Sequence, residues 1–187
     1  MRETLQERLV RTGLELLADQ PAERLSLRQL AEKLDVSHQA PYVHFGSKRR
    51  FLAAVAGAGL RRATAQAKAA VASAAEPLAR LHALVDAYLR FIRTQPHVHD
   101  LAYGPLVAKA DHPLLQQAAI EYWDLLHETV AACQPEGTGE EEILRRCAVT
   151  WGTVYGLATL DGASVPGDRY ALIHEAVDTL NQVWHSQ

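Results

Sequence analysis

Apolar residues recur every three or four positions through most of the chain, which is the spacing of an amphipathic helix. The clearest run lies between two prolines and consists of Leu78, Leu81, Val85, Tyr88 and Ile92. No segment alternates apolar and polar residues with the period of two that a half-buried strand shows. The pattern therefore predicts an all-α protein.

Prolines, glycines and N-capping side chains divide this pattern into about nine helices. Ser26, Ser37, Ser47 and Asp168 are the predicted N-caps, and Gly162 to Gly167 is a predicted turn. The predicted helices run from about 5 to 19, 27 to 34, 38 to 44, 48 to 72, 77 to 95, 97 to 103, 113 to 133, 143 to 158 and 169 to 184.

The second and third predicted helices are both short and are joined by a turn of only a few residues, which is the helix-turn-helix arrangement. Asp35 lies where the chain must reverse, and aspartate tolerates the left-handed backbone conformation better than most residues. We expect an N-terminal helix-turn-helix domain over residues 1–47. A long helix then leads into a C-terminal helical bundle, with an effector-binding and dimerisation domain over residues 48–187.

The net charge of −3 hides a strong asymmetry along the chain. Residues 1–62 carry eleven Lys or Arg against seven Asp or Glu, whereas residues 63–187 carry eight against fifteen. A basic head on an acidic body favours DNA as the partner of the N-terminal end.

Cys133 and Cys147 both fall at apolar positions of helical patterns, which favours small core residues over a disulfide scaffold or a thiolate metal site. The N-terminus runs into charged residues without the apolar stretch of a signal peptide. The apolar stretch 52–60 is far too short to span a bilayer. We therefore expect a cytoplasmic protein without a membrane partner.

The stretch 25–51 carries the residues that we expect to contact DNA. Serines at helix starts leave hydroxyl and amide groups available to phosphate oxygens, and polar side chains on the exposed face of the third helix could reach base edges in the major groove. The predicted DNA-binding residues are Ser26, Ser37, His38, Gln39, Pro41, Tyr42, His44 and Lys48. Arg49 and Arg50 add positive charge at a helix start, against the preference of the helix dipole, although a solvated surface run explains them equally well.

This segment resembles the DNA-binding domain of the TetR family over roughly residues 5 to 55. The family pattern is matched by Leu27, Leu30, Ala31, Val36, Ser37, Tyr42, His44, Phe45 and Lys48. The resemblance implies that Tyr42, His44 and Lys48 contact phosphates while His38, Gln39 and Pro41 lie at base edges. Two departures stand out: Asp35 replaces the usual turn glycine, and Arg49 and Arg50 replace acidic residues that are common there.

The C-terminal part resembles the family more loosely. The stretch from Trp151 to Leu157 is similar to a subgroup signature reading Trp-x-x-x-His-Gly, with Tyr155 in place of the histidine. The resemblance also implies that the last two helices pair with those of a second subunit as a four-helix bundle. The predicted dimer-interface residues are Gly152, Gly156, Leu180 and Trp184.

Pockets between the helices of a bundle are mostly apolar with a few polar anchors. From helix placement, the residues that could line an effector pocket are Tyr88, Phe91, Tyr103, Trp123, His127, Trp151 and Tyr155. Packing in the hydrophobic core is the simpler explanation for any single one of them.

The sequence favours a DNA-binding transcriptional regulator that is not an enzyme and needs no cofactor. It predicts a homodimeric repressor that binds a palindromic operator and is released by a largely apolar small-molecule effector, although activation in place of repression stays open. No phosphate-binding loop, nucleophile motif or spaced carboxylate pair stands out.

Two alternatives belong to other classes. One is a helical protein that sequesters small molecules and has lost DNA binding. The other is a metal-dependent enzyme built on His97, His99 and Asp100 with His112 or His127. Against the enzyme, these histidines lack the helical His-x-x-x-His spacing, so we expect no metal site.

Overall fold

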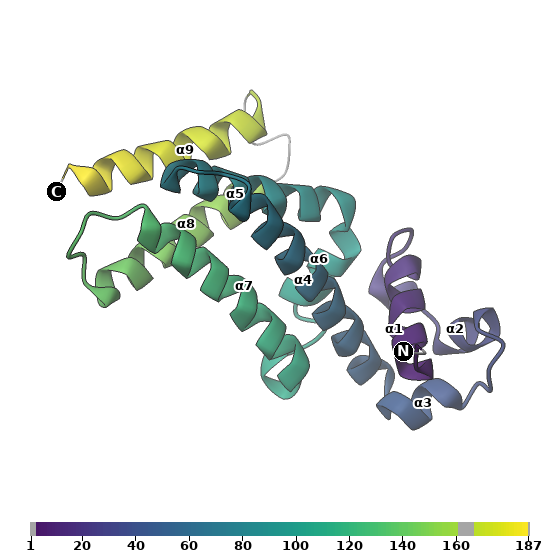
Figure 1. Ribbon diagram of the computed structural model, residues 1–187. Coiled ribbons are helices and arrows are strands. Elements are labelled where there is room, and N and C mark those ends of the chain that lie inside the picture. The colour runs from purple at the N-terminus through teal and green to yellow at the C-terminus, as the bar shows by residue number, and fades with distance from the viewer. Residues whose placement is uncertain (1–2, 161–166, 187) are drawn as a thin grey trace. The chain divides into compact units, whose positions relative to one another are not determined.

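The computed structural model describes residues 3–160 and 167–186, and within them the chain forms nine α-helices, two short 3-10 helices and no strand (Figure 1). The all-α prediction is confirmed. In chain order the elements are α1 Leu5–Leu16, η1 Ala22–Arg24, α2 Leu27–Lys33, α3 Ala40–Phe45, α4 Lys48–Ala72, α5 Pro77–Thr94, α6 Pro96–Tyr103, η2 Lys109–Asp111, α7 Pro113–Ala132, α8 Glu140–Thr159 and α9 Arg169–His185.

Two compact units divide the chain, and each includes two separate stretches of it. The first unit comprises Met1–Thr64 with Arg90–Tyr122, and the second comprises Ala65–Leu89 with Trp123–Gln187. The long helices α4, α5 and α7 each contribute residues to both units. The boundary predicted at residue 47 separates two functions and not two compact units, so it stays a prediction.

The first unit packs α1, α2 and α3 against one another around leucines and aromatic rings. Leu9, Leu17, Leu30 and Phe51 are all fully buried. Gly13 lets α1 approach α4 closely, since a Cβ atom at this position would lie 2.8 Å from the Cζ atom of Phe51. This close packing holds α1 against α4, and α2 and α3 both pack against α1.

The second unit contains the pair α8 and α9, which lie side by side (Figure 1). Cys147 of α8 and Ile173 of α9 are fully buried. Cys133 is buried as well, and burial raises the pKa of both cysteine thiols to about 11. The expectation that the cysteines are core residues is confirmed.

Most predicted helix ends agree with the structure to within a few residues. The Ser26 Oγ atom accepts a hydrogen bond from the Gln29 amide, Ser47 Oγ accepts one from the Arg50 amide, and Asp168 caps α9. Residues 162–166 of the predicted turn lie outside the described part of the chain, and Gly167 has φ +86°.

The third helix begins later than predicted, and Ser37 is not its N-cap. Ser37 instead starts a turn, in which its Oγ atom accepts from the Gln39 amide at 3.3 Å and its carbonyl accepts from the Ala40 amide at 2.8 Å. The helix then starts at Ala40 with Pro41 in its first turn, where the fixed φ of proline suits a helix and its missing N–H costs nothing.

None of the described helices is both long enough and apolar enough to cross a membrane.

Candidate nucleic-acid interface

The turn between α2 and α3 has the geometry that a helix-turn-helix needs. Asp35 adopts φ +52°, a left-handed conformation, and the Val36 amide then donates back to the Ala31 carbonyl at 3.0 Å. The predicted reversal at Asp35 is confirmed. An aspartate can therefore occupy the position where the resemblance leads one to expect glycine.

One side of α3 is anchored in the first unit and the other side faces outward. Pro41 and Phe45 are buried, and the ring of Phe45 meets the ring of Phe51 edge-on with 5.1 Å between centroids. Gln39, Tyr42 and Val43 are exposed, and their spacing of three and four places them on one helix face. The packing thus presents a defined outward face made of these three side chains, which we call the α3 face.

Pro41 is the one predicted base-reading residue that the structure places differently. The sequence prediction put Pro41 on the exposed face, but it is buried. The reason is that Pro41 lies one helical turn before the core residue Phe45 and shares its inward direction.

Val43 takes the outward position instead, and sequence reasoning overlooked it. Its side chain is 80% exposed, the largest exposure among the large apolar residues of the described chain. The available signal was its position two residues after Pro41, which puts it on nearly the opposite side of the helix.

Polar and charged side chains surround the α3 face. His38 and His44 are exposed, and His38 Nε2 lies 3.3 Å from Glu32 Oε1. Residues 36–60 contain no Asp or Glu but include Lys48, Arg49 and Arg50. A run of this kind attracts a polyanion, since no acidic side chain of the same segment offsets its charge.

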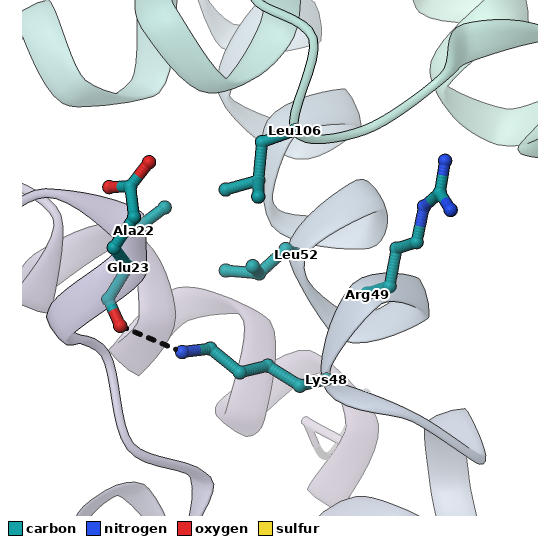
Figure 2. A pocket seen from close by; sticks show the side chains of 6 residues that line it. All are labelled: Ala22, Glu23, Lys48, Arg49, Leu52 and Leu106. Carbon is teal, nitrogen blue, oxygen red and sulfur yellow. Dashed lines mark hydrogen bonds between the residues drawn. The ribbon is translucent and has the colours of Figure 1, made fainter.

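Lys48 starts α4 and reaches across a hollow of about 280 Å³ (Figure 2). Its ammonium group donates a hydrogen bond of 3.0 Å to the backbone carbonyl of Glu23 in η1. The residues that line the hollow are Ala22, Glu23, Lys48, Arg49, Leu52 and Leu106. In Figure 2 Arg49 extends away from Lys48, and its guanidinium nitrogen lies 3.7 Å from Asp111 Oδ2.

The predicted effector residues fall into two groups. In the second unit, the ring of Trp151 lies 5.0 Å from Tyr88 and 6.0 Å from Tyr155, while His127 pairs with Glu140 at 2.9 Å. Trp123 lies on α7 and is half-buried. None of the seven predicted residues lines the hollow beside Lys48.

The other two predicted effector residues lie in the first unit, around a histidine that the pocket prediction did not include. His99 is buried, and its ring lies 5.8 Å from Phe91 and 4.9 Å from Tyr103. Burial lowers the pKa of His99, and it also lowers the pKa of Lys109, whose ammonium lies 4.5 Å from the Tyr103 ring centroid.

The predicted dimer residues are at least partly exposed. A Cβ atom added at Gly152 or Gly156 would meet nothing within 4 Å, while Leu180 and Trp184 are half-buried. The guanidinium of Arg146 lies 5.4 Å from the Trp184 ring centroid.

The histidines considered as metal ligands are not brought together into a metal site. His99 Nδ1 lies 3.6 Å from the carboxylate of Asp100, its neighbour in the chain. Across residues 3–160 and 167–186, no three His, Cys, Asp or Glu side chains are grouped so that they could hold a metal ion.

Comparison with known proteins gives two family matches. Residues 9–55 match a family described as "Bacterial regulatory proteins, tetR family". Residues 81–180, more than half of the chain, match one described as "Tetracyclin repressor-like, C-terminal domain". The tetracycline repressor protein class C of Escherichia coli is 47% identical over 60 residues, which span 32% of this chain and 27% of the length of that repressor.

Solved structures share the fold along nearly the whole chain. A protein with unknown function from Rhodococcus sp. RHA1 is 28% identical, with a TM-score of 0.78 over 98% of this chain and 96% of that one. AibR, solved in complex with isovaleryl coenzyme A and operator DNA, is 16% identical, with a TM-score of 0.65 over 93% and 96% of the two chains.

The family matches thus cover both the helix-turn-helix that presents the α3 face and the greater part of the remaining helices. The chain belongs to the TetR family of DNA-binding transcriptional regulators, whose members are not enzymes.

Proposed function

We propose that this regulator is a repressor that binds a palindromic operator as a homodimer and is released by a small-molecule effector. The main support for operator binding is the α3 face. It presents Gln39, Tyr42 and Val43 outward beside a cationic stretch without acidic residues. A helix of this kind can enter the major groove while its cationic neighbours neutralise phosphates.

We assign the contacts as follows. Gln39, His38 and Val43 would face base edges, and Tyr42, His44 and Lys48 would contact the sugar-phosphate strand with the serine hydroxyls of Ser26 and Ser37. Lys48 can serve a phosphate because its ammonium has three hydrogens and gives one to Glu23. Because the proposed partner is operator DNA, we also infer that the protein acts in the cytoplasm.

Operator binding is tested by comparing Tyr42→Ala with Lys48→Ala on duplex DNA. Both should reduce binding strongly. Tyr42→Ala should leave thermal stability nearly unchanged because Tyr42 is 48% exposed, whereas Lys48→Ala also loses the hydrogen bond to Glu23 and should cost about 1 kcal/mol. Lys68→Ala is the matched control, because Lys68 is an exposed cation further along α4. Wild-type affinity in both test variants would overturn the assignment.

The dimer is supported by exposed apolar side chains on α8 and α9. Leu144 and Val149 of α8 are 42% and 43% exposed, Leu160 just after α8 is 45% exposed, and Val183 of α9 is 48% exposed. Gly152 and Gly156 lie on the same helix with open space beside them, so a second copy could approach closely. Exposed apolar side chains gathered on adjacent helices mark an interaction surface.

Gly152→Glu tests this surface directly. The open space around Gly152 lets the substituted monomer fold, while a buried carboxylate in the interface would separate the subunits. We expect half the wild-type mass by sedimentation, whereas Ala132→Glu at an exposed site of α7 should leave the mass unchanged. A dimer that persists in Gly152→Glu would contradict the proposed interface.

The effector site is proposed in the second unit around Tyr88, Trp151 and Tyr155, with Trp123 and His127 on α7. Phe91 and Tyr103 of the first unit are a separate candidate group. AibR shows that this fold can hold both a small molecule and operator DNA. Screening small molecules by thermal shift and tryptophan fluorescence tests the site. An effector should raise the melting temperature, lower operator affinity and lose its effect in Trp151→Leu.

The functional boundary at residue 47 belongs to the same proposal. Residues 1–47 carry the operator contacts except Lys48, and residues 48–187 carry the effector and dimer surfaces.

A further inference from the structure

Two histidines from different helices of the second unit face each other ring to ring. His82 lies on α5 and His174 on α9, with ring centroids 4.7 Å apart and ring planes inclined by 21°. Their Nδ1 atoms are 2.5 Å apart, and the two side chains are only 25% and 19% exposed. The pair therefore joins the two helices in a partly water-excluded position.

The other nitrogen of each ring faces a carboxylate from the opposite helix. His82 Nε2 lies 2.7 Å from Asp178 Oδ1, and His174 Nε2 lies 2.8 Å from Asp86 Oδ1. Asp86 also accepts a hydrogen bond from the hydroxyl of Tyr170. Each helix thus supplies one histidine and, four residues later, one aspartate, and the pairing crosses between the helices. We call His82, Asp86, His174 and Asp178 the α5–α9 clasp.

The carboxylates determine where the ring hydrogens are. An ionised carboxylate only accepts hydrogen bonds, so each Nε2 atom must carry the hydrogen that it donates. A neutral imidazole has one N–H, which leaves only a lone pair on each Nδ1 atom. Two lone pairs cannot face each other at this distance without repulsion, and two N–H groups would collide. One added proton between the two Nδ1 atoms turns the contact into a short N–H···N hydrogen bond.

We propose that the α5–α9 clasp binds one proton between the Nδ1 atoms of His82 and His174, and that this shared proton holds α9 on α5. The charged and titratable groups that face the pair are Asp86 and Asp178, with the Tyr170 hydroxyl on Asp86. Among the described residues, no Lys or Arg nitrogen lies within 4 Å of either carboxylate. The shared proton thus supplies the positive charge that attracts the carboxylates of Asp86 and Asp178.

A consequence for assembly rests on the function proposed above. Helix α9 carries Val183, one of the exposed apolar residues that we assign to the dimer, so loss of the clasp would weaken the dimer.

Nitrogen NMR of the full-length protein with labelled histidine tests the clasp. Near pH 6.5 the Nδ1 resonances of His82 and His174 should both lie between the protonated and the lone-pair positions, and they should share one strongly low-field proton. His174→Asn supplies an amide N–H that can donate to His82 Nδ1 without an added proton. The shared low-field proton of the wild type should therefore be absent from the spectrum of His174→Asn.

His185→Asn is the matched control, because His185 is exposed near the end of α9 and its Nδ1 atom contacts only the Asn181 carbonyl. Nδ1 resonances of His82 and His174 that behave as two independent imidazoles, or a low-field proton that persists in His174→Asn, would overturn the clasp. So would a stabilisation by Zn²⁺ that the wild type shows and His174→Asn lacks, since a metal ion would then be the natural occupant. If His174→Asn fails to fold, the wild-type resonances decide alone. A confirmed clasp in a chain that is monomeric at every pH would refute the proposed dimer and leave the clasp standing.

Discussion

The ammonium of Lys48 and the backbone carbonyl of Glu23 are joined by a 3.0 Å hydrogen bond that ties the first turn of α4 to η1. This contact holds the Lys48 side chain extended along the hollow in Figure 2. A lysine held in this way has lost part of its conformational freedom before DNA arrives, so that part of the entropic cost of the phosphate contact is already met.

Lys48→Gln should weaken binding to all duplexes by a similar factor, because a phosphate contact carries no sequence information. The slope of log affinity against log salt should become shallower by about one unit. Fluorescence anisotropy over a salt series measures both quantities. Lys68→Gln serves as the control, and a slope that is the same in Lys48→Gln and the wild type would remove Lys48 from the interface.

Val43→Ala should change sequence preference while leaving stability almost intact. An apolar side chain in the major groove contacts a thymine methyl group, so we expect a loss of about 1 kcal/mol at one base pair of each half-site. Stability should shift by less than about 0.5 kcal/mol, since the side chain is 80% exposed. Binding to a panel of single base-pair variants measures this, with Leu114→Ala on α7 as the control. An equal loss on every duplex would contradict base reading by Val43.

Asp35→Gly should stabilise the protein by up to about 1 kcal/mol, because φ +52° costs an ordinary residue roughly 1–2 kcal/mol, part of which the flexibility of glycine in the unfolded chain offsets. Asp35→Val should lose more than about 1 kcal/mol at the same position, and Asp35→Asn should be nearly neutral. Chemical denaturation of the three variants provides the test. A destabilised Asp35→Gly would show that the aspartate side chain makes a contribution of its own.

Gly13→Ala should destabilise the protein by about 1–3 kcal/mol. Its new Cβ atom would lie 2.8 Å from both Phe51 Cζ and Val55 Cγ2, so two buried side chains would have to shift. Helix propensity alone predicts the opposite, a gain of about 1 kcal/mol. Gly13→Ala together with Phe51→Leu should recover part of the loss. A stabilised single variant would mean that α1 and α4 are packed less tightly than described.

The helices of this fold and most of their ends could be predicted from the sequence. Capping serines and prolines mark most helix ends, because they act within a few residues of where they stand. The error at α3 has the same local origin, since Ser37 can cap a helix or begin a turn, and only the inward packing of Pro41 and Phe45 selects the turn. That packing depends on Phe51, which the sequence alone does not place against Phe45.

Contacts between residues far apart in the chain could not be predicted, because no local pattern marks them. His82 and His174 are ninety-two positions apart, and neither stood out in the sequence as a functional residue. The spacing of each histidine from its aspartate is visible in the sequence, but the crossed pairing appears only once α5 and α9 are side by side. The seven predicted effector residues were visible in the sequence, but their spacing is also that of core residues. It therefore does not reveal which of them line a cavity.

Selection of bound duplexes from a random DNA pool, with the wild type and Tyr42→Ala in parallel, tests the central claim most directly. Two α3 faces on a two-fold dimer should recover a palindrome whose half-sites are about one helical turn, or a multiple of it, apart, and Tyr42→Ala should recover little of it. A pool that stays random with the wild type, or a palindrome that Tyr42→Ala recovers equally well, would contradict the account.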